Sequence, residues 1–534
     1  MLENDVRQVE EEGKSVRRSR ILVGLALVLI FAVTLSGCSG GKAKNTGKKI
    51  VMARPVDSNN LDPIIQASNP NIWVLNLVME GLVSSDEKGT RNDVPSLATE
   101  WKMADDKKSI TFTLRPGVKF SDGTTMTADD VVWSLERART TKESPWAFAL
   151  VAITKTEVVD KTHVKISLKQ PWGPIFADLA MFNAVVTSKA YFEKVGAKAF
   201  SEKPLGTGPF QIAEWVKGDH ITLTRNPYYW QKGKPLVDEI RINVVPDDNT
   251  RIMQLKGGQV DMVESIPFSN VAELQKDPNV NMLLPPALAI GYIGFNNTKP
   301  PFNDPRVRNA LAYATDKTAI VKMVLFGQGE VATSFMAKAD PNWNPNVKGH
   351  PYDLDKAKQL LKDAGFAGGL KLEIVINPGS VVTSQIATIL KDQWKRAGVD
   401  VTIKQMDGAS LTPYVRGFQY QVNVGGWTYD MIDSSEIAER TCVSGISKNL
   451  WTGWGDSGSK IAAQVEQLTA QAEAEMDPAK AKAIYYQMQE LYDQDAPRIP
   501  IYYAPYTFAT SKKITGFVQN PLGVYRFENL DKTK

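Results

Sequence analysis

At 534 residues, the chain is too long for one hydrophobic core, which usually stops growing at about 250–300 residues, so we expect two or three packed domains. Its 43% hydrophobic and 23% charged residues are typical of a globular protein and exclude both a disordered chain and a polytopic membrane protein. The 63 basic residues nearly balance the 59 acidic ones, and the resulting net charge of +4 argues against a nucleic-acid partner.

The N-terminus has the pattern of an export signal. A basic flank precedes an uncharged apolar run over residues 21–35, which is shorter than the roughly 20 residues that span a bilayer as a helix. The Leu-Ser-Gly-Cys motif that follows resembles a bacterial lipobox, which implies that residues 1–37 are removed and that Cys38 is lipidated. Residues 38–49, rich in Gly, Lys and Asn, are then a flexible tether. An uncleaved anchor helix with an incidental cysteine is the alternative.

The folded body begins with antiparallel β-structure and continues with alternating helices and strands. Polar and apolar residues alternate with the period of a strand over 109–114 and 163–168. Thr127 followed by Asp129 and Asp130 is typical of a helix N-terminus. In chain order, we expect strands at 50–53, 109–114, 163–168, 221–224, 240–245, 370–376, 399–403 and 498–503, and helices at 73–82, from 127, 304–326, 353–365, 384–397 and, as a pair, 459–495. The later alternation predicts an α/β layer with a partly parallel sheet.

Motifs that would carry catalysis or bind metal are few. The three histidines are far apart, and two cysteines, Cys38 and Cys442, cannot form a four-thiolate zinc site or an iron–sulfur cluster, so we expect no metal or cofactor. The loop around Ser457 matches that of a chymotrypsin-like serine, but this chemistry also needs a histidine base oriented by a carboxylate. A G-x-S-x-G match at Ser39 lacks the strand and helix of a nucleophile elbow. We therefore expect no catalytic residues, and a membrane-anchored serine hydrolase remains the alternative from another class.

Several segments, in a fixed order, carry a resemblance to a known family. They are residues 94–101, 112–124, 206–210, 225–230, 302–308 and 314–317. These segments are similar to the family 5 extracellular solute-binding proteins of bacterial ABC importers, which bind oligopeptides, dipeptides and nickel complexes. The similarity runs from about residue 50 to the C-terminus, and so it covers nearly all of the expected mature chain.

The resemblance implies an α/β fold of the periplasmic-binding-protein type II, with two lobes, an extra small β-rich domain and a ligand in the interlobe cleft. Domain I of the first lobe would be discontinuous, over residues 50–88, 205–285 and 498–534. The β-rich domain II would span 89–204, and domain III, the second lobe, would span 286–497. Hinge closure on the ligand would then signal the loaded state to a membrane permease.

The segment 425–430 (GGWTYD) resembles the one with which peptide-binding members hold the N-terminus of the ligand. The match assigns Asp430 to the α-ammonium group, because an ammonium buried by closure needs a carboxylate. Trp427 would pack beside the ligand, with Gly425 and Gly426 allowing close approach of the backbone. Further candidate ligand-binding residues are Ser68, Trp146 and Tyr292. The residues by themselves also fit a turn cap at Asp430 and a core position for Trp427.

The leading interpretation is a lipid-anchored peptide receptor on the outer face of the bacterial cytoplasmic membrane. No cationic residue that would grip a peptide C-terminus can be identified, which favours oligopeptides over dipeptides. The expected partners are the peptide or another small solute, an ABC permease with its ATPase subunits, and the membrane through the anchor; we expect a monomer. An oligosaccharide, a nickel chelate or an opine is the alternative ligand for the same fold, and a sensor or adhesion lipoprotein is an alternative outside transport.

Overall fold

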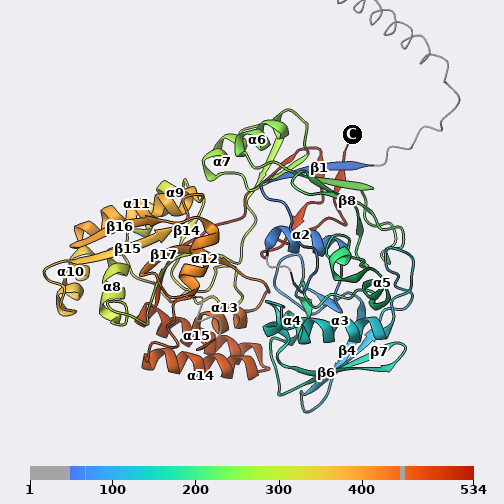
Figure 1. The fold of residues 1–534 in the computed structure, drawn as a ribbon, viewed down its shortest axis with the longest axis horizontal. Helices are drawn as coiled ribbons and strands as arrows, with labels where there is room; N and C mark the ends of the chain where they lie inside the picture. Colours follow the sequence, from blue (N-terminus) through green and yellow to red (C-terminus); the bar gives the residue numbers. More distant parts are fainter. Residues whose placement is uncertain (1–47, 66–67, 446–450, 534) are drawn as a thin grey trace, which may run out of the picture. The chain divides into compact units, whose positions relative to one another are not determined.

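The computed structural model describes residues 48–533 apart from 66–67 and 446–450. The predicted signal peptide and lipidated Cys38 lie outside the described residues, so both stay predictions. Within the described part of the chain, no helix is both long and apolar enough to cross a membrane. This part forms two lobes, each built around one large β-sheet (Figure 1).

Lobe 1 is built around a seven-stranded mixed sheet. Its strands, in spatial order, are β12 (Val280–Leu283), β19 (Phe508–Ser511), β11 (Met262–Glu264), β1 (Lys49–Arg54), β10 (Glu239–Val244), β9 (His220–Arg225) and β8 (Phe210–Val216). The strand β1 pairs in parallel with both β10 and β11, and it buries Ile50 and Met52 completely. Because these strands come from three distant stretches of the chain, lobe 1 is discontinuous in sequence.

Lobe 1 also contains a small antiparallel sheet. Its strands, in order, are β4 (Ala98–Met103), β5 (Ser109–Leu114), β7 (His163–Leu168) and β6 (Ile153–Asp160). The predicted alternation is confirmed in β5 and β7, whose apolar side chains all face the core. The predicted helix start at Thr127 is also confirmed, because the backbone N–H of Asp130 donates to the Thr127 hydroxyl (3.2 Å) and the N–H of Thr127 donates to Asp130 (3.0 Å).

The remaining elements of lobe 1 cover these two sheets. Its helices are α2 (Asn69–Val78), α3 (Ala128–Thr140), η1 (Ala147–Leu150), α4 (Ile175–Ala180), α5 (Lys189–Phe200), α6 (Asp248–Lys256) and α7 (Phe268–Leu274). Three short strand pairs are β2 (Val83–Ser84) with β3 (Val94–Pro95), β20 (Ile514–Thr515) with β23 (Asp531–Lys532), and β21 (Val518–Gln519) with β22 (Tyr525–Arg526).

Lobe 2 is built around a six-stranded mixed sheet. Its strands, in order, are β14 (Glu330–Val331), β18 (Arg498–Tyr503), β13 (Ala289–Phe295), β17 (Val422–Thr428), β15 (Leu370–Ile376) and β16 (Val399–Gln405). Its helices are α8 (Pro305–Tyr313), α9 (Lys317–Val324), α10 (Leu354–Asp363), α11 (Val381–Arg396), α12 (Gly408–Arg416), α13 (Ser434–Cys442), α14 (Lys460–Ala474) and α15 (Pro478–Asp495). As the alternating pattern predicts, β15 is parallel to both β16 and β17.

The domain boundary expected near residue 498 needs one correction. The sequence-based division places residues 498–534 in lobe 1, but β18 pairs with β13 and β14 in the sheet of lobe 2. The ring of Tyr502 in β18 lies directly over Gly291 of β13, where an added Cβ would be 2.3 Å from the ring. This close packing holds residues 498–503 in lobe 2, and the chain returns to lobe 1 only with β19.

The helix α2 ends earlier than the sequence predicts, and this shapes the wall between the lobes. The predicted helix runs to residue 82, whereas α2 ends at Val78. The chain segment that contains Gly206 and Gly208 packs against the C-terminal end of α2. Gly208 N donates to Val78 O (2.9 Å), and a Cβ added at Gly206 would lie 2.1 Å from the same oxygen. The chain after Val78 is therefore extended.

Replacing Gly206 with alanine is expected to destabilise the protein by about 1–3 kcal/mol, because the added methyl group overlaps backbone that cannot move away. The matched control is Gly368→Ala, since no heavy atom lies within 4 Å of a Cβ added at Gly368. Urea unfolding monitored by tryptophan fluorescence should show a lower midpoint for Gly206→Ala than for Gly368→Ala. Equal midpoints would contradict the close contact.

Candidate functional site

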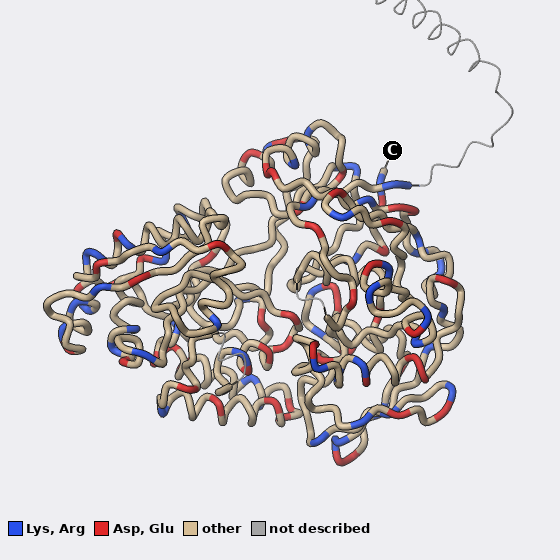
Figure 2. The backbone as a smooth tube through the Cα atoms, viewed as in Figure 1, with Lys and Arg blue, Asp and Glu red and all other residues tan. Residues whose placement is uncertain are grey.

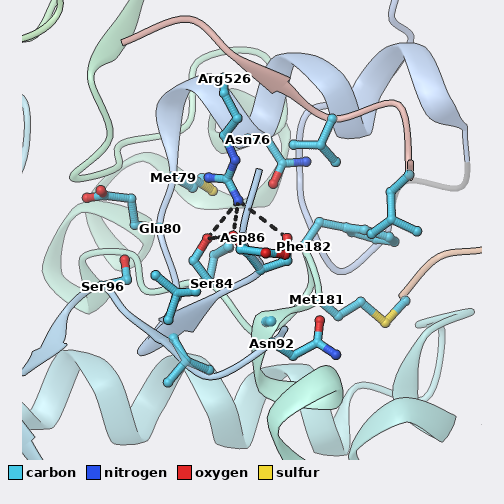
Figure 3. Close-up of a pocket in the computed structure, with 18 of the residues that line it drawn as sticks. Asn76, Met79, Glu80, Ser84, Asp86, Asn92, Ser96, Met181, Phe182 and Arg526 are labelled. Atoms are coloured by element: carbon cyan, nitrogen blue, oxygen red, sulfur yellow. Dashed lines mark hydrogen bonds between the residues drawn. The ribbon is translucent and has the colours of Figure 1, made fainter. Parts of the chain in front are cut away.

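A cavity of about 320 Å³ lies between the two lobes (Figure 3). Lobe 1 contributes α2, the extended segment after it and α4, while lobe 2 contributes residues 429–432, directly after β17. The lining is rich in acidic groups. The charged side chains that line it are Glu80, Asp86, Glu87, Asp430, Arg526 and Glu528.

A second cavity of about 690 Å³ shares Trp73 with the first. It is lined by Glu264 and Phe268 of lobe 1 and by Phe326 and Val381 of lobe 2. Because Asp430 lines the first cavity and not the second, we take the first as the candidate ligand site.

Asp430 stands in the turn between β17 and α13, where the chain enters the cavity wall. Its backbone N–H donates to Glu436 Oε2 (2.7 Å), and the Trp427 indole N–H donates to Glu436 Oε1 (3.1 Å). Arg440 Nε lies 3.5 Å from Glu436 Oε1. Glu436 is thus well supplied with donors, while the Oδ2 atom of Asp430 is buried and has no hydrogen-bond partner among the described residues.

Burial and the nearby charge of Glu436 raise the pKa of Asp430 well above its usual range. Burial also raises the pKa of Glu436, but Arg440 and the N–H donors around it act in the opposite direction. Arg440 offsets only part of the rise at Asp430, whereas Glu436 is also stabilised in its charged form by hydrogen bonds from three N–H groups. An ammonium group beside Asp430 would stabilise its ionised form and fill the unmet acceptor.

The other predicted residues of the GGWTYD segment lie behind this wall. Trp427 is half-buried, and its main polar contact is with Glu436. Gly425 and Gly426 are in β17 opposite Tyr292 and Gly291 of β13. None of the predicted residues Trp427, Gly425, Gly426 and Tyr292 lines either cavity. Their roles as ligand contacts stay predictions. In this structure Gly425, Gly426 and Tyr292 belong to the paired strands β17 and β13, and Trp427 donates to Glu436, which also accepts from the Asp430 backbone N–H.

Two further predicted residues, from lobe 1, are near the cavity without lining it. Trp146 is 7% exposed and packs at 4.9 Å, edge to face, against Phe182, which does line the cavity. Ser68 is the N-cap residue of α2 and directly precedes Asn69, which is also part of the lining. Both predicted contacts with the ligand stay predictions.

The wall in lobe 1 contains a carboxylate that the sequence analysis missed. Glu80 accepts hydrogen bonds from Thr207 Oγ1 (2.8 Å), Tyr229 Oη (3.2 Å) and Trp230 Nε1 (3.0 Å). Burial raises the pKa of Glu80 to about 7. Its three partners belong to the segments 206–210 and 225–230, which were recognised as motifs, but the sequence does not show that both converge on the same side chain.

The second missed residue is Arg526, in the short strand β22. Its Nη2 atom donates to Ser84 Oγ (2.7 Å) and Ser85 O (2.9 Å), and Figure 3 shows the side chain directed at this part of the wall. Ser84 and Arg526 are 442 positions apart in the chain, so no local pattern could have predicted the contact.

The two lobes touch each other around the cavity. Asn92 Nδ2 of lobe 1 donates to Ile432 O of lobe 2 (2.7 Å), and the guanidinium of Arg440 lies 4.0 Å from the ring centroid of Phe148. These contacts place residues 429–432 against lobe 1 and enclose the cavity.

Asp178 in α4 lies close to three carboxyl groups of lobe 2, which are Asp433 at the start of α13, Glu439 in α13 and Glu473 in α14. Figure 2 shows acidic positions along the backbone of both lobes where the lobes meet. Burial raises the pKa of all four, to about 7 at Glu439 and about 8 at Glu473. The three carboxylates of lobe 2 further raise the pKa of Asp178, although Trp172 donates a hydrogen bond to it (2.7 Å).

The structure gives no support to the serine hydrolase alternative. Ser457 Oγ donates to the backbone carbonyl of Trp454, in its own loop. Within the described residues, His163, His220 and His350 make their hydrogen bonds to other side chains, and none bonds to Ser457. The arrangement of nucleophile, base and orienting carboxylate is therefore not assembled at Ser457.

Comparisons with known proteins agree with this geometry. The family described as bacterial extracellular solute-binding proteins, family 5 Middle, matches residues 93–449. The glutathione-binding protein GsiB of Escherichia coli K12 is 29% identical over 522 residues, which cover 97% of this chain and 99% of that protein. The dipeptide-binding protein of the same strain is 29% identical over 470 residues, covering 83% of this chain and 86% of that protein.

Among solved structures, the ABC transporter-associated periplasmic binding protein DppA of Helicobacter pylori, in complex with the peptide STSA, is 25% identical. Its TM-score is 0.81, and the match covers 91% of this chain and 98% of that one. These matches confirm the predicted fold class, a two-lobed α/β fold of the periplasmic-binding-protein type.

Proposed function

The chain belongs to the bacterial extracellular solute-binding proteins of family 5, and from this premise we propose that it captures peptides with a free N-terminus for an ABC importer. As a member of that family, it is a solute-binding component of such an importer. The peptide is enclosed between the lobes and delivered to a membrane permease and its ATPase subunits. The cavity of about 320 Å³ is at the lower end of the range of ligand sites, roughly 300–1,000 Å³, and favours peptides of a few residues.

The observation that carries this proposal is the unpaired Oδ2 atom of Asp430 in the cavity wall. A buried carboxylate without a partner is costly, and a ligand ammonium is the group that removes the cost. The relatives named for glutathione and for dipeptides, and the neighbour that holds the peptide STSA, support the same ligand class.

Isothermal titration calorimetry with the detergent-solubilised full-length protein tests the proposal. The panel consists of the dipeptide Met-Leu, the tetrapeptide STSA and reduced glutathione, with a linear oligosaccharide and a nickel–histidine chelate as the competing classes. We expect binding to at least one of the three peptides and to neither competitor. Binding only to the oligosaccharide or the chelate would replace the peptide assignment while leaving the transport role in place.

We also propose that Cys38 carries the lipid that holds the protein on the outer face of the cytoplasmic membrane. Replacing Cys38 with alanine removes the thiol that would be acylated. Because stable anchoring requires more than one acyl chain or signal, the variant should no longer be held on the membrane. We therefore expect Cys38→Ala to move the protein from the membrane fraction of the cell to the soluble exported fraction. The control is Cys442→Ala, because Cys442 is buried in lobe 2 and its loss should leave the protein in the membrane fraction. A Cys38→Ala variant that stays in the membrane would instead indicate an uncleaved anchor helix.

A further inference from the structure

The C-terminal end of α14 in lobe 2 meets the segment that leads into α4 in lobe 1 (Figure 1). The backbone N–H of Gly173, two positions before α4, donates to the backbone carbonyl of Glu473 (2.7 Å). The last carbonyl groups of a helix have no partner within the helix. Lobe 1 therefore supplies a hydrogen-bond donor that α14 itself does not provide.

The packing at this contact is too close for a side chain at position 173. A Cβ added at Gly173 would lie 2.7 Å from the backbone oxygen of Glu475 and 3.4 Å from that of Glu473. The three atoms nearest to that Cβ all belong to lobe 2. The backbone of Gly173 is outside the left-handed region, so its conformation does not itself require glycine. The close approach of the other lobe is what excludes a methyl group here.

The contact at Gly173 differs in kind from two other contacts between the lobes. Asn92 reaches Ile432 O through its side-chain amide, and the guanidinium of Arg440 lies over a ring. Side chains of this kind can turn to another rotamer, whereas Gly173 and Glu473 meet backbone to backbone. Because the two residues belong to different lobes, the hydrogen bond is broken whenever the lobes separate.

This contact is also separate from the ligand site. Neither Gly173 nor Glu473 lines the first or the second cavity. An effect of Gly173 on binding therefore has to pass through the equilibrium between the open and the closed form of the protein. Such an effect weakens every enclosed ligand by the same factor, since the apparent affinity scales with the population of the form that binds.

We propose that the backbone contact between Gly173 and Glu473 is a latch that holds the two lobes closed and sets the affinity for all ligands together. The latch is a conformational device beyond the proposed function, which enters only in the choice of peptides for the test. The absence of a side chain at Gly173 lets α14 approach, and the hydrogen bond fixes α14 in place.

The test compares the full-length protein with Gly173→Ala and with the control Gly368→Ala. No heavy atom lies within 4 Å of a Cβ added at Gly368, so this variant makes the same chemical change in open space. Calorimetry gives the affinities for Met-Leu and for STSA. Small-angle X-ray scattering of the ligand-free variants at pH 6 gives their radii of gyration.

We expect Gly173→Ala to weaken the binding of both peptides by a common factor of about 10 to 100, which corresponds to the usual effect of an added methyl group in a packed contact. Its radius of gyration without ligand should exceed that of Gly368→Ala, because the closed form is less populated. Gly368→Ala should keep the affinities of the unmodified protein. Matching circular dichroism spectra of the two variants show that a lost affinity is not a lost fold.

A Gly173→Ala variant that keeps both affinities overturns the inference. A loss confined to one of the two peptides also overturns it, because it would reveal an effect on that ligand and not on closure. If neither peptide binds to the unmodified protein, the proposed function fails, and scattering then decides on the latch by itself: equal radii for Gly173→Ala and Gly368→Ala overturn it, and a larger radius for Gly173→Ala supports it.

Discussion

Replacing Asp430 with asparagine is expected to weaken the binding of a peptide with a free N-terminus by about 100-fold or more. The variant leaves the ligand ammonium enclosed without its carboxylate, and breaking a buried ion pair by removing one partner costs about 3–5 kcal/mol. Calorimetric titration of Met-Leu into the two proteins measures the loss.

N-acetyl-Met-Leu is the matched ligand control for Asp430→Asn. Acetylation removes the ammonium, so the unmodified protein should bind this peptide weakly and the substitution should cause little further loss. The protein control is Asp407→Asn, because Asp407 caps α12 on the surface of lobe 2 and asparagine is an equally good cap. An equal loss for the free and the acetylated peptide would show that Asp430 acts on the fold of the turn and not on the ammonium.

Closure of the two lobes without ligand is expected to become more favourable as the pH falls. Asp178 of lobe 1 faces Asp433, Glu439 and Glu473 of lobe 2, and burial raises the pKa of each. Arg440, on the same helix as Glu439, lowers the pKa of that residue only in part. Carboxyl groups with raised pKa values bind protons more strongly in the closed form, so closure is lost as the pH rises through about 7 and 8.

Small-angle X-ray scattering of the ligand-free protein between pH 8.5 and pH 6 measures this change. The radius of gyration should decrease as the pH falls, with the ratio of closed to open molecules rising about tenfold for each unit by which the contact raises a pKa. Glu473→Gln should stay closed to a higher pH and should show a weaker dependence, because it lacks the charge that closure buries. A radius that does not change over this range, or a variant that follows the original curve, would contradict the account.

Local sequence signals predicted the secondary structure where each element depends on its own residues. The strand over 370–376 coincides with β15, because the apolar residues Leu370, Leu372 and Ile374 alternate with polar ones and face the core. The helix expected over 304–326 is instead two helices, α8 and α9. The side chain of Asp316 accepts a hydrogen bond from Ala319 N (2.9 Å) and begins a new helix, which the apolar periodicity does not reveal.

The candidate site was predictable only in part, because some of its residues depend on contacts between distant segments of the chain. Asp430 follows a glycine-rich strand within a recognisable segment, and so its place in the cavity wall could be expected from the sequence. Glu80 and Arg526 depend on contacts between segments that are more than 100 positions apart. The sequence contains their partners but does not reveal the packing that brings them together. The same packing directs the Trp427 indole N–H to Glu436 and not into the cavity.

A crystal structure of the protein with bound Met-Leu tests the central claim most directly. The account predicts that the peptide lies in the cavity between α2 and residues 429–432, with its ammonium nitrogen about 3 Å from Asp430 Oδ2. A peptide whose ammonium lies away from Asp430, or one bound only in the second cavity, would contradict it.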